Sequence, residues 1–145
     1  MVVSQHLSVD GPLFLNPTLY KSLVGVAQNL TITCPYIAYD VNSISQFLYS
    51  PTKDHFLAIK RILRYINGTL HFGITFHPSA APSALVAYSD VDWARCLDTC
   101  HSTFGYCIYL DDNLVSWSAK KQPTVSCSSC EFEYRALALT IAELL

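Results

Sequence analysis

LVAYSDVDW, residues 85–93, alternates between apolar and polar side chains and ends in two carboxylates. A period of two is typical of a β-strand with one buried face. About forty residues later, EFEY, residues 131–134, places two more acids at the start of an apolar, helix-like segment. Carboxylates at a strand end and in the first turn of a helix can share a divalent metal ion. These segments therefore predict a strand, a helix and a place where chemistry could occur.

Asp90 and Glu133 are the acids best placed for such a site, and two interpretations are open. The alternation puts Asp90 on the strand face that carries Val86 and Tyr88. An Asp at a strand end is often only a turn or capping residue. Paired with a Glu in the first turn of a helix, it becomes a candidate Mg²⁺ ligand.

The composition limits the class of protein. The chain has 145 residues, enough for one domain or for one domain and a small satellite. Hydrophobic residues make up 51% of the sequence and charged residues 14%, but no apolar run approaches the roughly 18 residues of a membrane span. Residues 1–11 lack the features of a signal peptide. We therefore expect no membrane partner and an intracellular location, cytoplasmic or nuclear.

The six cysteines suggest a competing metal site. In an intracellular protein, cysteines are more often free thiols or metal ligands than disulfides. Two pairs, with a histidine beside the first, have spacings that allow a structural zinc site: Cys96, Cys100, His101, Cys127 and Cys130. Free thiols are the alternative interpretation.

Three helical segments are predicted in the first half of the chain. Asn16-Pro17 and Cys34-Pro35 each begin a segment with apolar residues at helical spacing. Ser50-Pro51 begins a third, which ends at Asn67-Gly68. Short helices with matched apolar faces are expected to form a small bundle. Residues 70–76 then alternate as a candidate strand.

The second half is predicted to have the order β-β-β-α. After a linker at 77–83, strands are expected at 85–90, 104–110 and 114–118, the last two joined by a tight hairpin at 111–113. The closing helix is expected to bury Leu137, Ile141 and Leu144. The fold class is therefore α+β, a small helical bundle followed by a β-β-β-α unit.

The third helix carries a cluster of basic residues, Lys60, Arg61 and Arg64, on or near one face. Such a cluster is either a solvated surface or a stripe that contacts phosphates. The net charge of −2 argues against strong nonspecific binding of nucleic acid by the chain as a whole.

Seven stretches resemble the Pol polyprotein of Ty1/copia-type LTR retrotransposons of plants. They occur in the same order as in that family and cover nearly the whole chain after about residue 13. The stretches are LYKSLVG (19–25), PYIAY (35–39), KRILRYINGT (60–69), SDVDWA (89–94), STFGYC (102–107), SWSAKKQPTV (116–125) and EYRALA (133–138).

The resemblance implies a division of the chain into two functional parts. Residues 1–76 would be the C-terminal, thumb-like region of a reverse transcriptase, 77–83 a linker, and 84–145 the N-terminal half of an RNase H-like domain. Asp90 and Glu133 would be Mg²⁺ ligands for hydrolysis of RNA in RNA–DNA hybrids, with Asp92 and Glu131 as neighbours.

The resemblance also implies that the catalytic sets are incomplete. RNase H uses four acids around two metal ions, and the family's third and fourth acids would lie beyond residue 145. The polymerase acids would lie before residue 1. We therefore expect a retrotransposon fragment that is inactive as an enzyme and holds Mg²⁺ weakly.

The expected partners are an RNA–DNA hybrid or template–primer duplex and the remainder of a Pol polyprotein. A nucleic-acid-binding module without catalysis is the alternative. It would use five basic residues, Lys60, Arg61, Arg64, Lys120 and Lys121.

Overall fold

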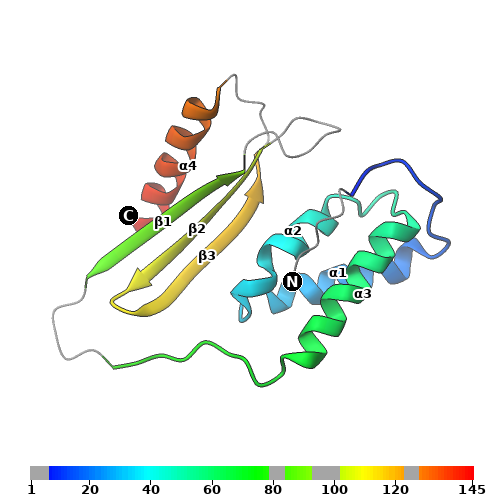
Figure 1. The fold of residues 1–145 in the computed structure, drawn as a ribbon, viewed down its shortest axis with the longest axis horizontal. Helices are drawn as coiled ribbons and strands as arrows, with labels where there is room; N and C mark the ends of the chain where they lie inside the picture. The colour runs from blue at the N-terminus through cyan, green and yellow to red at the C-terminus, as the bar shows by residue number, and fades with distance from the viewer. Residues whose placement is uncertain (1–6, 79–83, 93–101, 123–127) are drawn as a thin grey trace. The chain divides into compact units, whose positions relative to one another are not determined.

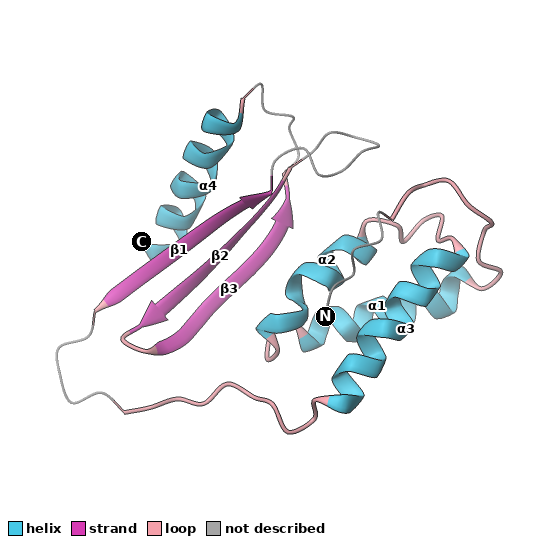
Figure 2. Ribbon diagram, viewed as in Figure 1, coloured by secondary structure: helices cyan, strands magenta, loops and turns pink. Residues whose placement is uncertain are grey.

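The structure, a computed structural model, describes residues 7–78, 84–92, 102–122 and 128–145. The chain divides into two compact units, Met1–Gly73 and Ile74–Leu145. The first is helical, and the second combines a three-stranded antiparallel sheet with one helix (Figures 1 and 2). The mixed helix-and-sheet class predicted from the sequence is confirmed. No helix in the described part of the chain is long and apolar enough to cross a membrane.

The helical unit contains α1 (Pro17–Leu30), the short 3₁₀ helix η1 (Pro35–Ile37), α2 (Ala38–Ser45) and α3 (Lys53–Gly68). The three predicted helical segments are therefore confirmed. The Asn16 side chain accepts a hydrogen bond from the Leu19 amide at 3.0 Å and caps α1 as expected. The cap of α3 is Thr52 and not Ser50, because the Thr52 hydroxyl and the His55 ring form a reciprocal capping box.

The core of the helical unit is built from all four of its elements. Its fully packed residues are Tyr20, Val24, Ala27, Ile37, Val41, Ile44, Ala58, Ile59 and Ile62. The Tyr20 hydroxyl donates a 2.8 Å hydrogen bond to the Ile44 carbonyl oxygen inside this core. That bond joins α1 to α2 and satisfies the polar end of a buried ring. Burial raises the pKa of Tyr20.

The strand predicted at 70–76 is wrong. Residues 72–78 have no regular secondary structure, and Leu70, Phe72 and Phe76 are exposed. Alternation alone does not make a strand, because the ladder also needs a partner for its amides and carbonyls. No described strand pairs with this segment.

The sheet is made of β1 (Leu85–Asp92), β2 (Thr103–Leu110) and β3 (Asn113–Lys121), in the order β1-β2-β3. All three predicted strands are confirmed, each slightly longer than expected. Leu110 pairs with Asn113, so the β2–β3 hairpin turns on Asp111 and Asp112. Asp111 has φ +53°, a left-handed conformation that Asp tolerates better than most residues.

The hairpin turn also holds the chain that leads into β1. Asp111 exchanges two 2.8 Å hydrogen bonds with the backbone of Ala84, one from its own amide and one to its carboxylate. The Asn113 side chain makes a similar pair with the backbone of His77, at 2.7 and 2.9 Å. Both contacts lie within the second unit. Of the predicted linker, residues 79–83 lie outside the described part of the chain.

Helix α4 (Ser129–Leu144) covers one face of the sheet. It buries Phe132 and Ala136 against three side chains of β2: Phe104, Tyr106 and Ile108. The expectation that Leu137 and Ile141 are buried is wrong, since they are 48% and 47% exposed. The buried stripe is instead Phe132, Ala136 and Thr140, at a spacing of four. Leu144 packs at the edge of the same cluster, as expected.

Candidate functional site

Asp90 is exposed near the C-terminal end of β1. Ala87 and Val91 of the same strand pack on the cluster beneath α4. Because side chains alternate along a strand, Asp90 faces away from α4, with Val86 and Tyr88. Its Oδ1 atom accepts a 2.9 Å hydrogen bond from the Val91 amide. The strand face predicted for Asp90 is therefore correct, but this is the face that α4 does not cover.

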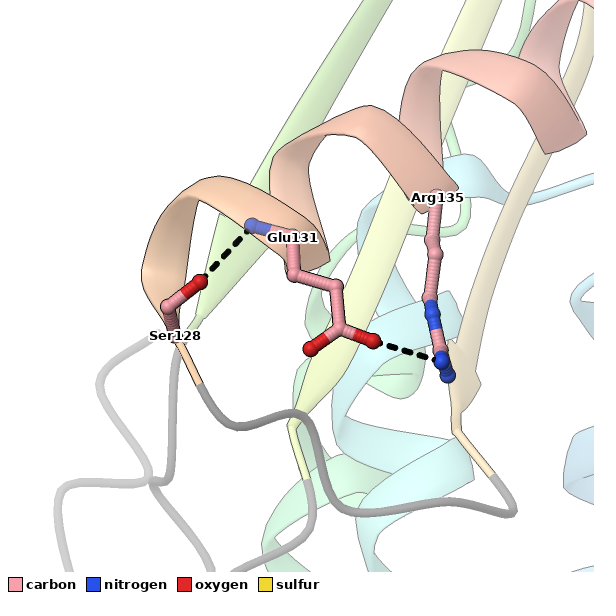
Figure 3. Close-up of polar contacts among 3 residues, drawn as sticks. All are labelled: Ser128, Glu131 and Arg135. Atoms are coloured by element: carbon pink, nitrogen blue, oxygen red, sulfur yellow. Dashed lines mark hydrogen bonds and ion pairs between the residues drawn. The ribbon is translucent and has the colours of Figure 1, made fainter.

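Glu133 lies near the start of α4, where it is exposed. The helix begins with a cap in which the Ser128 hydroxyl accepts a 3.1 Å hydrogen bond from the Glu131 amide (Figure 3). The Glu131 carboxylate forms an ion pair with Arg135 one turn later, at 2.6 Å. A carboxylate in the first turn is favourable because it faces the positive end of the helix dipole. Glu131 therefore has a structural role at the start of α4.

The structure brings Asp90 and Glu133 to the same end of the sheet unit. Asp92 pairs with Thr103, and Thr103 pairs with Lys121, so β1 and β3 end together, and α4 begins beyond that end (Figure 1). Asp90 nevertheless points away from the helix that carries Glu133. In the described part of the chain, no group of three or more His, Cys, Asp or Glu side chains could hold a metal ion. These two carboxylates alone do not fit a two-metal site.

The predicted basic residues of α3 form one exposed stripe. Lys60, Arg61 and Arg64 lie on the side opposite the buried Ile59 and Ile62. The Lys60 ammonium lies 4.7 Å from the centroid of the Phe56 ring, a cation–π contact, and Phe56 in turn stacks on Phe14 at 4.0 Å. These two contacts hold the Lys60 side chain over the stacked rings of Phe56 and Phe14.

Lys53 belongs to the same stripe and was not singled out from the sequence. It is the first residue of α3 and is exposed, and its spacing to Leu57, Lys60 and Arg64 follows the helical repeat. The sequence could have revealed this residue, because Lys53, Lys60 and Arg64 are separated by seven and four residues, a helical spacing. The stripe of four cations extends about 16 Å along the helix, at 1.5 Å per residue.

Lys120 and Lys121, the other predicted basic residues, do not share a face. Lys120 pairs with Phe104, on the side of α4, whereas Lys121 pairs with Thr103. Consecutive residues of a strand point to opposite sides of the sheet. A single nucleic-acid backbone lying on one face could therefore contact only one of them directly.

The two units carry charges of opposite sign. Met1–Gly73 contains five Lys or Arg and three Asp or Glu residues, a net charge of +2. Ile74–Leu145 contains four Lys or Arg and eight Asp or Glu residues, a net charge of −4. The overall value of −2 therefore hides a basic helical unit, and the argument from net charge against nucleic-acid binding does not apply to that unit.

The alternative zinc site falls mostly outside the described residues. The structure does not describe four of its five candidate ligands, Cys96, Cys100, His101 and Cys127. Cys130 is an exposed free thiol at the start of α4. The two other described cysteines, Cys34 and Cys107, are free as well, and burial raises the pKa of Cys107.

Comparison with known proteins gives several clear relatives. An uncharacterized mitochondrial protein of Arabidopsis thaliana is 47% identical over 137 residues, which is 94% of this chain and 57% of that protein. The retrovirus-related Pol polyprotein from transposon RE1 of the same plant is 46% identical over 145 residues, 99% of this chain. The secreted RxLR effector protein 161 of Plasmopara viticola is 43% identical over 82% of this chain and 84% of its own length.

The chain is much shorter than the transposon relative, since it spans only 10% of the RE1 polyprotein. No protein-family model matches the chain. No solved structure matches it either. The family of the chain is therefore assigned from these sequence matches alone.

Proposed function

Since the chain belongs to the retrovirus-related Pol polyproteins of Ty1/copia-type transposons, we propose that it is a piece of the reverse transcriptase–RNase H region of such a polyprotein. The helical unit would be the thumb-like end of the reverse transcriptase. The sheet unit would be the first half of an RNase H-like domain. The observation that best supports the second assignment is the β-β-β-α order, with Asp90 near the end of β1 and Glu133 near the start of α4.

The ancestral reaction of the sheet unit would be Mg²⁺-dependent hydrolysis of RNA in an RNA–DNA hybrid. Two metal ions must bracket the attacking water and the leaving oxygen in that chemistry. Asp90 and Glu133 are the residues of this chain that would hold Mg²⁺. Two exposed carboxylates, one of them facing away from α4, do not fit a pair of divalent ions. The chain by itself is therefore inactive in this proposal.

A second function, nucleic-acid binding, is favoured by the stripe on α3. Lys53, Lys60, Arg61 and Arg64 would contact the phosphates of an RNA–DNA hybrid or a template–primer duplex. Four exposed cations along about 16 Å of helix match a backbone with one phosphate per 3.4 Å of rise in each strand. The opposite faces of Lys120 and Lys121, and the net negative charge of the unit that carries them, favour α3 as the main contact.

The salt dependence of binding tests this second function. Fluorescence anisotropy with a labelled RNA–DNA hybrid would measure the affinity over a range of salt concentrations. If all four cations contact phosphates, affinity should fall roughly a hundredfold between about 50 and 200 mM salt. A pair of substitutions, Lys60→Ala with Arg64→Ala, should reduce the slope of log affinity against log salt by about two.

Lys120→Ala with Lys121→Ala is the matched control, because it also removes two positive charges. It should change the slope by less than half as much as the α3 pair does. Equal effects of the two pairs would show that net charge alone drives binding and would contradict the assignment to α3. Measurable binding with no salt dependence would contradict phosphate contact altogether.

A further inference from the structure

Lys60 belongs to an aromatic cluster that joins α3 to the segment before α1. Its Nζ atom lies 4.7 Å from the centroid of the Phe56 ring, and Phe14 stacks on that ring at 4.0 Å with 16° between the ring planes. Because Phe14 occupies one face of the Phe56 ring, the ammonium group lies over the other face. Phe56 precedes Lys60 by four residues, a spacing that brings two side chains together on a helix. The two rings and the ammonium group therefore form three successive layers.

The backbone of Phe14 is fixed to the start of α3. The Phe14 amide donates a 2.8 Å hydrogen bond to the Pro51 carbonyl oxygen, and the Lys53 amide donates a 3.0 Å hydrogen bond to the Pro12 carbonyl oxygen. Both rings of the stack are half-buried and pack against the core of the helical unit. The surface beneath Lys60 is therefore held by packing and by backbone hydrogen bonds.

A second lysine of the helical unit, Lys21, lies over a ring that is far more exposed. Its Nζ atom is 5.5 Å from the centroid of Tyr49, whose side chain is 92% exposed. A ring in solvent keeps its choice of rotamers and restricts a neighbouring cation little. Phe56 packs on the core, so its contact restricts Lys60 more strongly.

This restriction matters because a lysine that binds a phosphate loses much of its rotational freedom. Freedom that is already lost in the free protein is not lost again on binding, which favours affinity. The ring also leaves the ammonium group able to bind, since Lys60 is exposed and an ammonium group has three N–H donors. The stack therefore prepares Lys60 for an anion without occupying all of its donors.

We propose that Phe56 and Phe14 are positioning residues for nucleic-acid binding, which hold the Lys60 ammonium group where it contacts a phosphate of the backbone. The inference rests on the second function proposed above, binding of an RNA–DNA hybrid or template–primer duplex by the stripe on α3. It adds that two uncharged residues set part of the affinity. One of them, Phe14, lies outside α3, so the segment before α1 contributes to the phosphate contact made by α3.

A double-mutant cycle between Phe56 and Lys60 tests this role. Fluorescence anisotropy would give the affinity for a labelled RNA–DNA hybrid of the wild type, Phe56→Leu, Lys60→Ala and the double variant. Phe56→Leu keeps an apolar side chain and every charge. It should weaken binding about threefold, within the factor of about two to five that an exposed cation–π contact is worth. In the Lys60→Ala background the same change should have no effect, because the positioned group is gone.

Tyr49→Leu is the matched control, because it also removes a ring beneath a lysine of the helical unit, and it should leave the affinity unchanged. Phe14→Leu supplies a second cycle that keeps the Phe56 ring, for use if Phe56→Leu disturbs the circular dichroism spectrum. It should weaken binding about twofold, again only when Lys60 is present.

The position of Lys60 can also be measured without nucleic acid. Protons over the face of an aromatic ring have lower NMR chemical shifts, so the ε-methylene protons of Lys60 should shift downfield in Phe56→Leu. No such shift, or an equal effect of Phe56→Leu on affinity in both backgrounds, would overturn the positioning role and leave phosphate binding by α3 in place. A wild-type chain without salt-dependent binding would overturn both the inference and the function on which it rests.

Discussion

The helical unit and the sheet unit are similar in length, but the buried cores of their described residues differ in size. In the described residues, the core of the helical unit has nine buried members drawn from α1, η1, α2 and α3. The core of the sheet unit has five, all from β2 and α4, and lies on one face of the sheet. The first core draws on four elements, whereas the second draws on two and leaves Leu137 and Ile141 of α4 exposed.

Because their cores differ in size, the two units can have different stabilities within one chain. Each buried large apolar side chain contributes about 1.5–3 kcal/mol, so the smaller core of the sheet unit has less to offset its loss of chain entropy. The helical unit also has a buried hydrogen bond between Tyr20 and Ile44. We therefore expect the sheet unit to unfold first.

The largest effect is expected from Phe132→Ala, which removes a central side chain from the smaller of the two cores. Phe132 is fully buried at the centre of the sheet-unit core. Its truncation should lower the free energy of unfolding of the sheet unit by about 3–5 kcal/mol, enough to unfold a marginally stable unit. Two-dimensional NMR spectra should lose the dispersed signals of the strands and keep those of α1 to α3. Leu139→Ala, at a position 44% exposed on the same helix, should leave both sets of signals in place.

A smaller effect is expected in the helical unit from Tyr20→Phe. This change removes the 2.8 Å hydrogen bond to the Ile44 carbonyl oxygen, which still accepts one from the Phe47 amide, and should lower the free energy of unfolding by about 0.5–1.5 kcal/mol. Urea denaturation followed through the helical signals would measure it. Tyr36→Phe, at a position 70% exposed, should change the midpoint little. Equal midpoints for the two variants would mean that the Tyr20 hydroxyl bond does not stabilise the unit.

The smallest effect is a pH dependence confined to the helical unit. Burial lowers the pKa of His55 from 6.5, against smaller opposing effects of the Ser8 backbone and the Asp54 carboxylate. Its Nδ1 atom accepts a 3.0 Å hydrogen bond from the Thr52 amide, which requires the neutral ring. The pKa of His55 is lower in the folded state than in the unfolded state, so the stabilisation that the neutral ring provides is complete above the unfolded pKa. It is lost as the pH falls through the folded value.

The free energy of unfolding of the helical unit should therefore decrease between about pH 7.5 and 5.5, a range that brackets the ordinary histidine pKa. Urea titrations at several pH values would measure the decrease. His55→Gln is the matched variant, because glutamine can occupy the same position of a capping box and does not titrate. A pH dependence that is the same in both proteins would assign it to other groups.

Much of the fold follows from the sequence because local chemistry decides it. Asn16-Pro17 specifies the start of α1, and Asp111-Asp112 specifies the hairpin, since each has the residues that its backbone geometry favours. The buried face of α4 could not be predicted, because Leu137 and Ile141 offer an apolar stripe as good as Phe132 and Ala136. Which stripe is buried depends on how the sheet lies against the helix.

The candidate site was predictable only in part, for a similar reason. Alternation along β1 correctly put Asp90 with Val86 and Tyr88. It could not say which face α4 would cover, because that depends on the packing of residues far apart in the sequence. Local alternation also led to the wrong prediction of a strand at 70–76, where the segment has no described strand partner.

Incubation of an RNA–DNA hybrid with the purified chain and Mg²⁺ tests most directly whether the chain binds the hybrid without cutting it. The basic helical unit would bind the hybrid, and the sheet unit carries two of the acids that hydrolysis needs. We expect the hybrid to be bound and to stay intact on a denaturing gel, with Mn²⁺ as well as with Mg²⁺. Cleavage of the RNA strand that disappears with Asp90→Asn would contradict the proposed function.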